Sequence, residues 1–177
     1  FAVFSALNQH FVPHLTSIGV VPTTAALVLS VASVASALGH VIIGPLLDGK
    51  HGILFTVLFA VASTIGYVLL ATAPATALLF LGGGLIGIGH CVSLVAIPVY
   101  SRKYLGGKDM GRISGLTGVL STIFPAVGVV VSASVYDQTG SYRPVFLTVA
   151  ALFLLLTLWV LVGYNNAMKK RQQAAAD

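Results

Sequence analysis

The sequence predicts an all-α integral membrane protein, and three observations lead to that fold class. Hydrophobic residues make up 57% of the 177 residues and charged residues only 7%, whereas a soluble domain averages about 25% charged residues. The mean hydropathy is +1.00. Several long stretches contain no Asp, Glu, Lys or Arg, and about 20 such residues are enough for a helix to cross the hydrocarbon core.

Five of these stretches are long enough to span a membrane. We place the predicted spans at residues 23–47, 53–72, 76–100, 113–136 and 145–164. Residues 1–12 are apolar but too short to span, so we expect the chain to begin halfway along a further helix. The Pro, Gly and charged residues between the spans predict connectors at 13–22, 49–52, 73–75, 101–112 and 137–143, and a charged tail from about 167. Residues 13–177 therefore hold five complete helices and the tail.

The basic residues of these connectors are unevenly divided between the two sides of the membrane. Eight fall on one side, namely Lys50, Arg102, Lys103, Lys108, Arg112, Lys169, Lys170 and Arg171, and Arg143 alone falls on the other. Because cytoplasmic loops carry the excess of Lys and Arg, we expect a cytoplasmic C-terminus in a plasma or inner membrane. The basic residues lie in short loops rather than on one solvated face, which argues against a nucleic-acid partner.

A few polar side chains lie inside the apolar stretches and are candidates for a substrate or ion pathway. His40 is one helical turn from Ser36, on a face that Ala32, Gly44 and Asp48 also share at intervals of four residues. The other candidates are His90, His10 and Asn8. Imidazoles at this depth usually face a bundle interior or a water-filled cavity. The alternative for each histidine is a neutral ring hydrogen-bonded to a neighbouring helix.

Glycines and prolines inside the spans predict packing and bending. Residues 82–87 match the dinucleotide-binding pattern G-x-G-x-x-G, but they lie inside an apolar span with no acidic residue after them, so the match is spurious. Gly83 and Gly87 instead predict a surface for close helix packing. Pro98 and Pro125 each remove a backbone hydrogen bond, which predicts either a hinge or a fixed kink.

Signatures of enzymes are missing from the sequence. It contains no H-E-x-x-H, no G-x-S-x-G and no pair of acids within a span. The four acidic residues lie at helix ends, in loops or in the tail: Asp48, Asp109, Asp137 and Asp177. We therefore expect no enzymatic activity, no cofactor and no metal site. Cys91, the only cysteine, lies in an apolar stretch and reads as a small buried residue.

Several short motifs resemble the C-terminal six-helix half of the major facilitator superfamily. Residues 44–52 are similar to a cytoplasmic loop motif of that family, with Gly44, Asp48 and Lys50 at its conformational positions and Gly49 where an Arg is usual. The runs Pro13-His14-Leu15-Thr16, Tyr104-Leu105-Gly106 and Tyr136-Asp137-Gln138-Thr139-Gly140-Ser141-Tyr142 resemble its monocarboxylate and oxalate/formate branch.

This resemblance implies that the chain supplies helices seven, in part, to twelve of a twelve-helix transporter. Helices seven, eight, ten and eleven would line a central cavity, and nine and twelve would lie outside it, in two inverted three-helix repeats. The partner would be the N-terminal six-helix half. In that branch an Arg that receives the substrate carboxylate commonly precedes the motif Gly by four residues, and His40 stands there. An imidazole binds a carboxylate only when it is protonated.

From these features we expect a secondary active transporter of a small organic anion, of the monocarboxylate or dicarboxylate type. It would work by alternating access as a symporter or antiporter, with a proton as the candidate coupling ion. The alternative is a membrane module for assembly or reception that does not transport. Six further spans upstream of Phe1 would favour the transporter.

Overall fold

The computed structural model describes residues 2–49, 51–72, 75–105 and 110–173. These residues form six helices: α1 (Ala2–Ser17), α2 (Pro22–Asp48), α3 (Gly52–Thr72), α4 (Thr76–Leu105), α5 (Met110–Thr139) and α6 (Arg143–Gln173). By length and composition, α2 to α6 can each cross a membrane. The predicted fold class, an all-α integral membrane protein, is therefore confirmed for the described residues.

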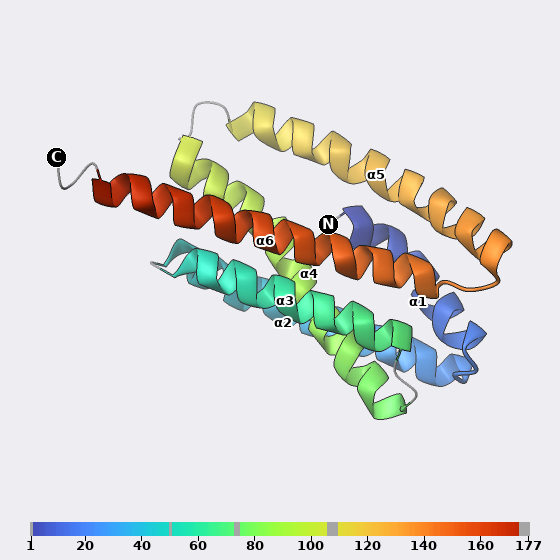
Figure 1. Ribbon diagram of the computed structural model, residues 1–177. Helices are drawn as coiled ribbons and strands as arrows, with labels where there is room; N and C mark the ends of the chain where they lie inside the picture. The colour runs from blue at the N-terminus through green and yellow to red at the C-terminus, as the bar shows by residue number, and fades with distance from the viewer. Residues whose placement is uncertain (1, 50, 73–74, 106–109, 174–177) are drawn as a thin grey trace.

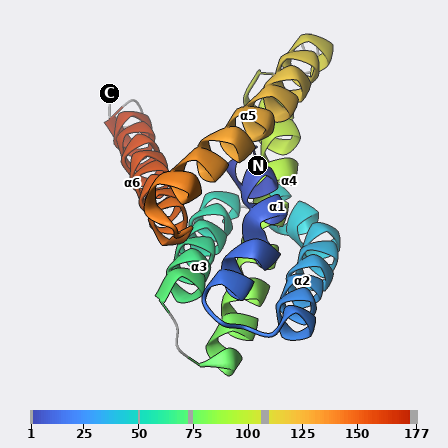
Figure 2. The ribbon, with the colours of Figure 1, turned by 90° about the vertical axis from the view of Figure 1, so that its right-hand side faces the viewer.

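The helices run side by side along one long direction (Figure 1). The last residues of α2, α4 and α6 and the first residues of α3 and α5 lie at one end of the bundle, and the opposite ends of these helices lie at the other. Helix α4 packs between α2 and α3, α6 packs on α3, and α1 packs mainly on α5. Seen end-on, α1 lies near the middle of the bundle and α6 at its periphery (Figure 2).

The first helix is longer than the sequence predicted. We expected a partial helix over residues 1–12 and a loop over 13–22, but α1 continues through Pro13 to Ser17. Proline removes only its own backbone donor, and membrane helices tolerate this where other groups compensate. The carbonyl that loses its usual donor is that of Gln9, four residues before Pro13, whereas the Thr16 hydroxyl donates to the carbonyls of Val12 and Pro13, 3.1 and 3.0 Å away. Because α1 reaches Ser17, the loop is reduced to residues 18–21, where Gly19 has a φ of 90°.

Two other predicted connectors and the predicted tail are also shorter in the structure. Helix α4 extends to Leu105 and α5 begins at Met110, inside the expected loop 101–112. Helix α5 continues to Thr139, and α6 reaches Gln173, well into the expected tail. Arg, Lys and Gln, which are frequent in the extended parts of α4 and α6, are good helix formers in water. Hydropathy therefore marks the apolar part of each helix rather than its ends.

Glycines let α4 approach α2 on one side and α3 on the other. A Cβ atom on Gly83 would lie 3.0 Å from the Val28 carbonyl oxygen, and one on Gly87 would lie 2.8 Å from the Ala32 carbonyl carbon, both on α2. On the opposite side, a Cβ on Gly89 would lie 2.8 Å from the Phe59 carbonyl oxygen of α3. The sequence predicted the first two positions and missed the third, because the spacing of a pattern does not show which helix packs against it.

Candidate functional site

Two histidines meet across the interface between α2 and α4. The His40 and His90 rings lie 6.1 Å apart, centroid to centroid, at an angle of 75°. The Ser36 hydroxyl, one turn before His40 on α2, lies 3.2 Å from Nδ1 of His90. All three side chains are partly buried. We call His40, His90 and Ser36 the α2–α4 histidine site. It unites three of the five residues that the sequence proposed for a pathway.

The register of the glycine contacts explains why these side chains meet. Along α2, Val28, Ala32 and Ser36 follow one another at intervals of four residues, so they share one face. Val28 lies against Gly83, Ala32 lies against Gly87, and Ser36 bonds to His90, three residues further along α4. Two parallel helices in close contact keep this register. The small residues therefore position the imidazole of α4 against the polar face of α2.

Hydrogen bonding fixes which nitrogen of His40 is protonated in the neutral ring. Nδ1 lies 2.7 Å from the Ser36 carbonyl oxygen, which can only accept, so Nδ1–H donates. In the neutral ring Nε2 then carries the lone pair. A proton added to His40 goes to Nε2 and makes the ring a cation that can pair with a carboxylate.

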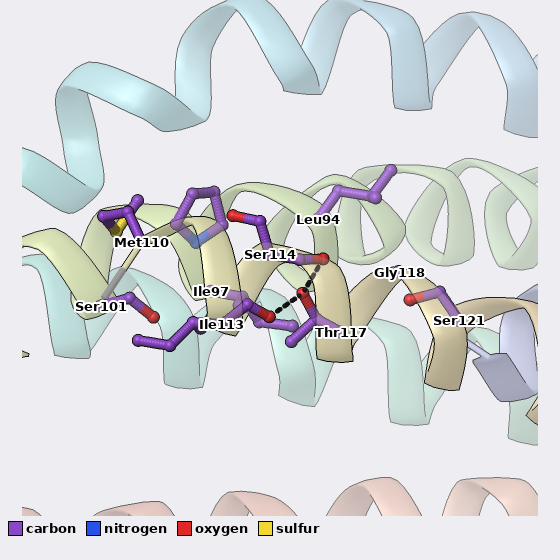
Figure 3. Close-up of a pocket in the computed structure, with 10 residues that line it drawn as sticks. Leu94, Ile97, Ser101, Met110, Ile113, Ser114, Thr117, Gly118 and Ser121 are labelled. Carbon is purple, nitrogen blue, oxygen red and sulfur yellow. Dashed lines mark hydrogen bonds between the residues drawn. The ribbon is translucent and has the colours of Figure 1, made fainter. Parts of the chain in front are cut away.

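A pocket between α4 and α5 begins on the face of α4 that carries His90. Leu94, Ile97 and Ser101 follow His90 at intervals of four, three and four residues and line the pocket, which has a volume of about 350 Å³. Pro98 lines it as well. Figure 3 shows these side chains of α4 opposite those of α5. On α4 the pocket therefore begins at Leu94, one helical turn beyond His90, and extends toward the end of the bundle where α4 ends and α5 begins. We call this end, which carries Arg102 and Arg112, the basic end of the bundle.

Helix α5 contributes hydroxyl groups and glycines to this pocket. Ser114 and Ser121 line it, together with Thr117, whose hydroxyl donates to the carbonyls of Ile113 and Ser114, 2.8 and 3.1 Å away (Figure 3). Gly118 lines it too, and a Cβ there would meet no heavy atom within 4 Å. Pro125 follows Ser121 by one turn and so lies on the same face. Helix α5 thus adds three hydroxyl groups to a pocket whose surface is mostly apolar.

His10 contributes to a different group of side chains, near the turn between α5 and α6. Its Nε2–H donates to the Val129 carbonyl of α5 over 3.1 Å, and its ring lies 5.1 Å from that of Tyr142. Burial raises the pKa of the Tyr142 phenol, and Tyr136 and Asp137 beside it raise this pKa further. Asn8, two residues before His10, is exposed on α1. Neither residue contacts the α2–α4 histidine site.

His14 is the central residue of this second group, and the sequence analysis did not propose it. Its side chain is fully buried, its ring stacks on Phe146 of α6 at 4.3 Å, and its Nε2–H donates to the Leu70 carbonyl of α3 over 2.9 Å. We call His10, His14, Tyr142 and Phe146 the α1 histidine cluster. Pro13 led us to expect a loop here, although the four-residue interval from His10 to His14 was the available signal of one helix face.

The loop motif between α2 and α3 lies at the basic end of the bundle. Asp48 ends α2 and forms an ion pair of 3.6 Å with Arg102 of α4, and both side chains are largely exposed. A Cβ on Gly44 would meet no heavy atom within 4 Å. Lys50, the third position of the motif, lies outside the described residues. Among those that are described, no group of three or more His, Cys, Asp or Glu side chains could hold a metal ion.

The fold and this arrangement define an integral membrane bundle with polar side chains between its spanning helices. The chain matches the Major Facilitator Superfamily over residues 1–176, and it belongs to that family. The family consists of membrane transporters, so transport is the general activity of this class. A comparison with curated proteins gave no match. The family match is to the superfamily as a whole, so the resemblance to the monocarboxylate and oxalate/formate branch enters below as a proposal.

Proposed function

We propose that this chain is the C-terminal half of a secondary active transporter that moves a small organic anion together with a proton. The observation that carries this proposal is the contact between His40 and His90, whose rings lie 6.1 Å apart across two spanning helices. Histidine is the side chain that ordinarily changes charge between pH 5 and 8. In this proposal the substrate is a monocarboxylate or dicarboxylate, and the N-terminal half supplies the other side of the cavity.

Charge balance links the anion to the proton. Two neutral imidazoles offer a carboxylate no net charge, and one added proton supplies the cation that the carboxylate needs in a site of low dielectric constant. A second proton would place two cations about 6 Å apart, which is unfavourable without an anion. Each ligand therefore strengthens binding of the other, as thermodynamic linkage requires.

The pocket between α4 and α5 supports a route to one side of the membrane. Its hydroxyl groups, on Ser101, Ser114 and Ser121, can replace water around a carboxylate as it moves. Pro98 and Pro125 lie on the faces of α4 and α5 that border this route, where a change of helix bend would open or close it. Their role as hinges belongs to this proposal, and a fixed kink is the alternative.

The proposal is tested by uptake of labelled lactate and oxalate into liposomes that contain the full-length transporter. Affinity should rise as the pH falls from 7.5 to 5.5, by up to about tenfold per pH unit, the limit for one proton. His40→Gln should weaken binding most at low pH, because no cation can form at that position. His40→Arg should keep the site cationic and flatten the pH dependence.

The control is His51→Gln, which removes an exposed imidazole in the turn between α2 and α3. This variant should keep the wild-type profile. If His40→Gln and His40→Arg also keep that profile, the α2–α4 histidine site does not bind the anion and the proposed mechanism is wrong. Uptake of neither anion by a folded wild-type protein would contradict the proposed class of substrate.

A further inference from the structure

A further pocket lies at the end of the bundle opposite the basic end, where α2, α4 and α6 begin and α3 ends (Figure 1). It has a volume of about 500 Å³, and more of its surface is polar than apolar. Its wall includes Arg143, and we call it the Arg143 pocket. It shares no residue with the α2–α4 histidine site or with the pocket between α4 and α5, so the proposed function leaves it unexplained.

Arg143 brings a positive charge to this pocket. Its Nε–H donates to the Ala71 carbonyl of α3 over 2.7 Å, which fixes the position of the guanidinium. The one ion pair within the described residues joins Asp48 to Arg102, at the basic end, so no described acidic side chain pairs with Arg143. The two Nη atoms carry four further N–H groups, in a geometry that can bind both oxygens of a carboxylate. Because Arg143 is exposed, a ligand can reach it.

Threonine side chains from three helices add hydroxyl groups to the wall. Thr24 lies in the first turn of α2, Thr72 ends α3 and Thr76 begins α4. The Thr72 hydroxyl donates to the Val68 carbonyl over 2.7 Å, so its hydrogen is already used. Within the described residues the hydroxyls of Thr24 and Thr76 form no hydrogen bond, and each can donate to an anion.

The first turn of α2 adds backbone donors to the same wall. Val21, the N-cap residue of α2, makes no side-chain bond to the helix, and both Val21 and Thr24 line the pocket. The first backbone N–H groups of a helix have no partner within it and form the positive end of its dipole. The arginine of α6 and the N-terminus of α2 therefore favour an anion independently of each other.

We infer that the Arg143 pocket binds the carboxylate of a small organic anion, with the Arg143 guanidinium as its charged partner and Thr24 and Thr76 as hydroxyl donors. The class of anion rests on the proposed function, to which this pocket adds a second binding site at the opposite end of the bundle. A lipid phosphate presents similar oxygens, but a mainly polar surface favours a soluble anion over the acyl chains of a lipid. The alternative is that Arg143 only stabilises the end of α3, whose last carbonyls have no donor within the helix.

A cysteine at Val21 reports on binding in the pocket without any need for transport. Val21 lines the pocket and is 61% exposed. The full-length transporter, with Cys91 and any cysteine outside these residues replaced by Ala, carries Val21→Cys and is treated in detergent with N-ethylmaleimide, an uncharged thiol reagent. Oxalate or lactate should slow the reaction relative to chloride at equal ionic strength. Gln138→Cys, at an exposed position outside the pocket, should react at the same rate with and without the anion.

Thr76→Glu tests the charge of the pocket without removing Arg143. It places a carboxylate at the first residue of α4, where the helix dipole favours one, so the variant should fold. The new carboxylate competes for Arg143 and should raise the half-protection concentration at least about tenfold, the effect of losing one hydrogen bond to a charged group. Thr76→Gln, the uncharged match, should raise it much less.

Variants of Arg143 test the guanidinium itself. Arg143→Gln should weaken protection at least as much as Thr76→Glu does. Arg143→Lys keeps the charge but not the two parallel hydrogen bonds, so its half-protection concentration should lie between those of the wild type and Arg143→Gln. If Arg143 only stabilises the end of α3, Thr76→Glu should leave protection unchanged.

Three results would overturn the inference. The first is the absence of protection of Val21→Cys by either anion. The second is protection that survives in folded Thr76→Glu or Arg143→Gln. The third is protection by phosphatidylglycerol added to the micelles without a soluble anion, which would assign the pocket to a lipid headgroup.

Failure of this inference is distinct from failure of the proposed function. Unprotected Val21→Cys in a transporter whose uptake depends on His40 as proposed would reject the Arg143 pocket alone. Protected Val21→Cys in a transporter whose uptake ignores the His40 variants would support the Arg143 pocket and reject only the α2–α4 histidine site.

Discussion

The α2–α4 histidine site and the α1 histidine cluster place the same side chain in two different surroundings. In the cluster, His14 is fully buried and its Nε2–H donates to a carbonyl of α3, while His10 donates to a carbonyl of α5. These bonds connect α1 to two other helices. In the α2–α4 site, His40 donates to the backbone of its own helix and is only partly buried. Within the described residues, its ring forms no hydrogen bond to the backbone of a second helix.

This difference suggests how one residue type serves structure in one place and ligand binding in another. A buried imidazole that bonds to the backbone of another helix holds a fixed neutral tautomer and contributes to stability. A partly buried imidazole beside another imidazole and a hydroxyl can exchange partners when a ligand or a proton arrives. Histidines in membrane helices are therefore best distinguished by their partners rather than by their depth.

The largest effect on stability should follow from removing His14. His14→Ala leaves a cavity beside Phe146 and removes the bond to the Leu70 carbonyl, so the free energy of unfolding should fall by about 2–4 kcal/mol. His40→Ala should cost less than about 1 kcal/mol, because the bond that it removes lies within one helix. The measurement is the thermal unfolding of each variant of the full-length protein in detergent. Equal losses would mean that both histidines are structural.

A smaller effect on stability should come from two glycines of α4, Gly87 and Gly84. The effect should have opposite signs, because only Gly87 lies in close contact with α2. Gly87→Ala forces a methyl group against the Ala32 backbone, and overpacking of this kind costs about 1–3 kcal/mol. At Gly84, one turn earlier on α4, the nearest atom to a new Cβ is a Val31 methyl carbon at 3.9 Å. Gly84→Ala should therefore stabilise the helix by up to about 1 kcal/mol.

Thermal unfolding of the two glycine variants checks this prediction, and pH-dependent uptake adds a second measurement. A folded Gly87→Ala protein should show weaker uptake because His90 moves relative to Ser36, whereas Gly84→Ala should transport like the wild type. Equal stability of the two variants would contradict the close contact between α2 and α4.

Much of the α2–α4 histidine site could be predicted from the sequence, because helical periodicity sets which residues of one helix share a face. Ser36 and His40 are four residues apart, and both were proposed as pathway residues together with His90. The contact between the two histidines could not be predicted, since periodicity does not say which helix packs against which face. The helix that packs against a given face is determined by where glycines allow close contact with its backbone, as Gly83 and Gly87 do for α2.

The α1 histidine cluster was harder to predict for two physical reasons. Pro13 suggested that the helix ends before His14, but α1 continues to Ser17, since a proline inside a membrane helix removes only its own backbone donor. The partners of His10 and His14 are also main-chain carbonyls, on Val129 and Leu70, which any residue type could provide. The ends of several helices were also predicted wrongly. Hydropathy shows which residues are apolar enough for a membrane, but a helix can continue beyond them.

The smallest effect on stability should come from the ion pair between Asp48 and Arg102, which lies at the basic end of the bundle, beyond both groups of histidines. Both side chains are more than half exposed and their charged atoms are 3.6 Å apart. Exposed pairs of this kind contribute less than about 1 kcal/mol. Asp48→Asn should therefore leave thermal unfolding almost unchanged.

If Asp48 acts in the loop motif of residues 44–52, Asp48→Asn should impair transport even though it leaves thermal unfolding almost unchanged. Because the pair joins the ends of α2 and α4, which carry His40 and His90, its loss should slow uptake without changing the pH dependence of binding. The matched control exchanges the two charges, with Asp48→Arg and Arg102→Asp in one protein, and should restore part of the rate if the pair itself matters. A loss of stability as large as that of His14→Ala would contradict the weak, exposed pair. If the uptake rate of Asp48→Asn is unchanged, the ion pair has no part in transport. The response to protons and anions would then depend on the α2–α4 histidine site without it.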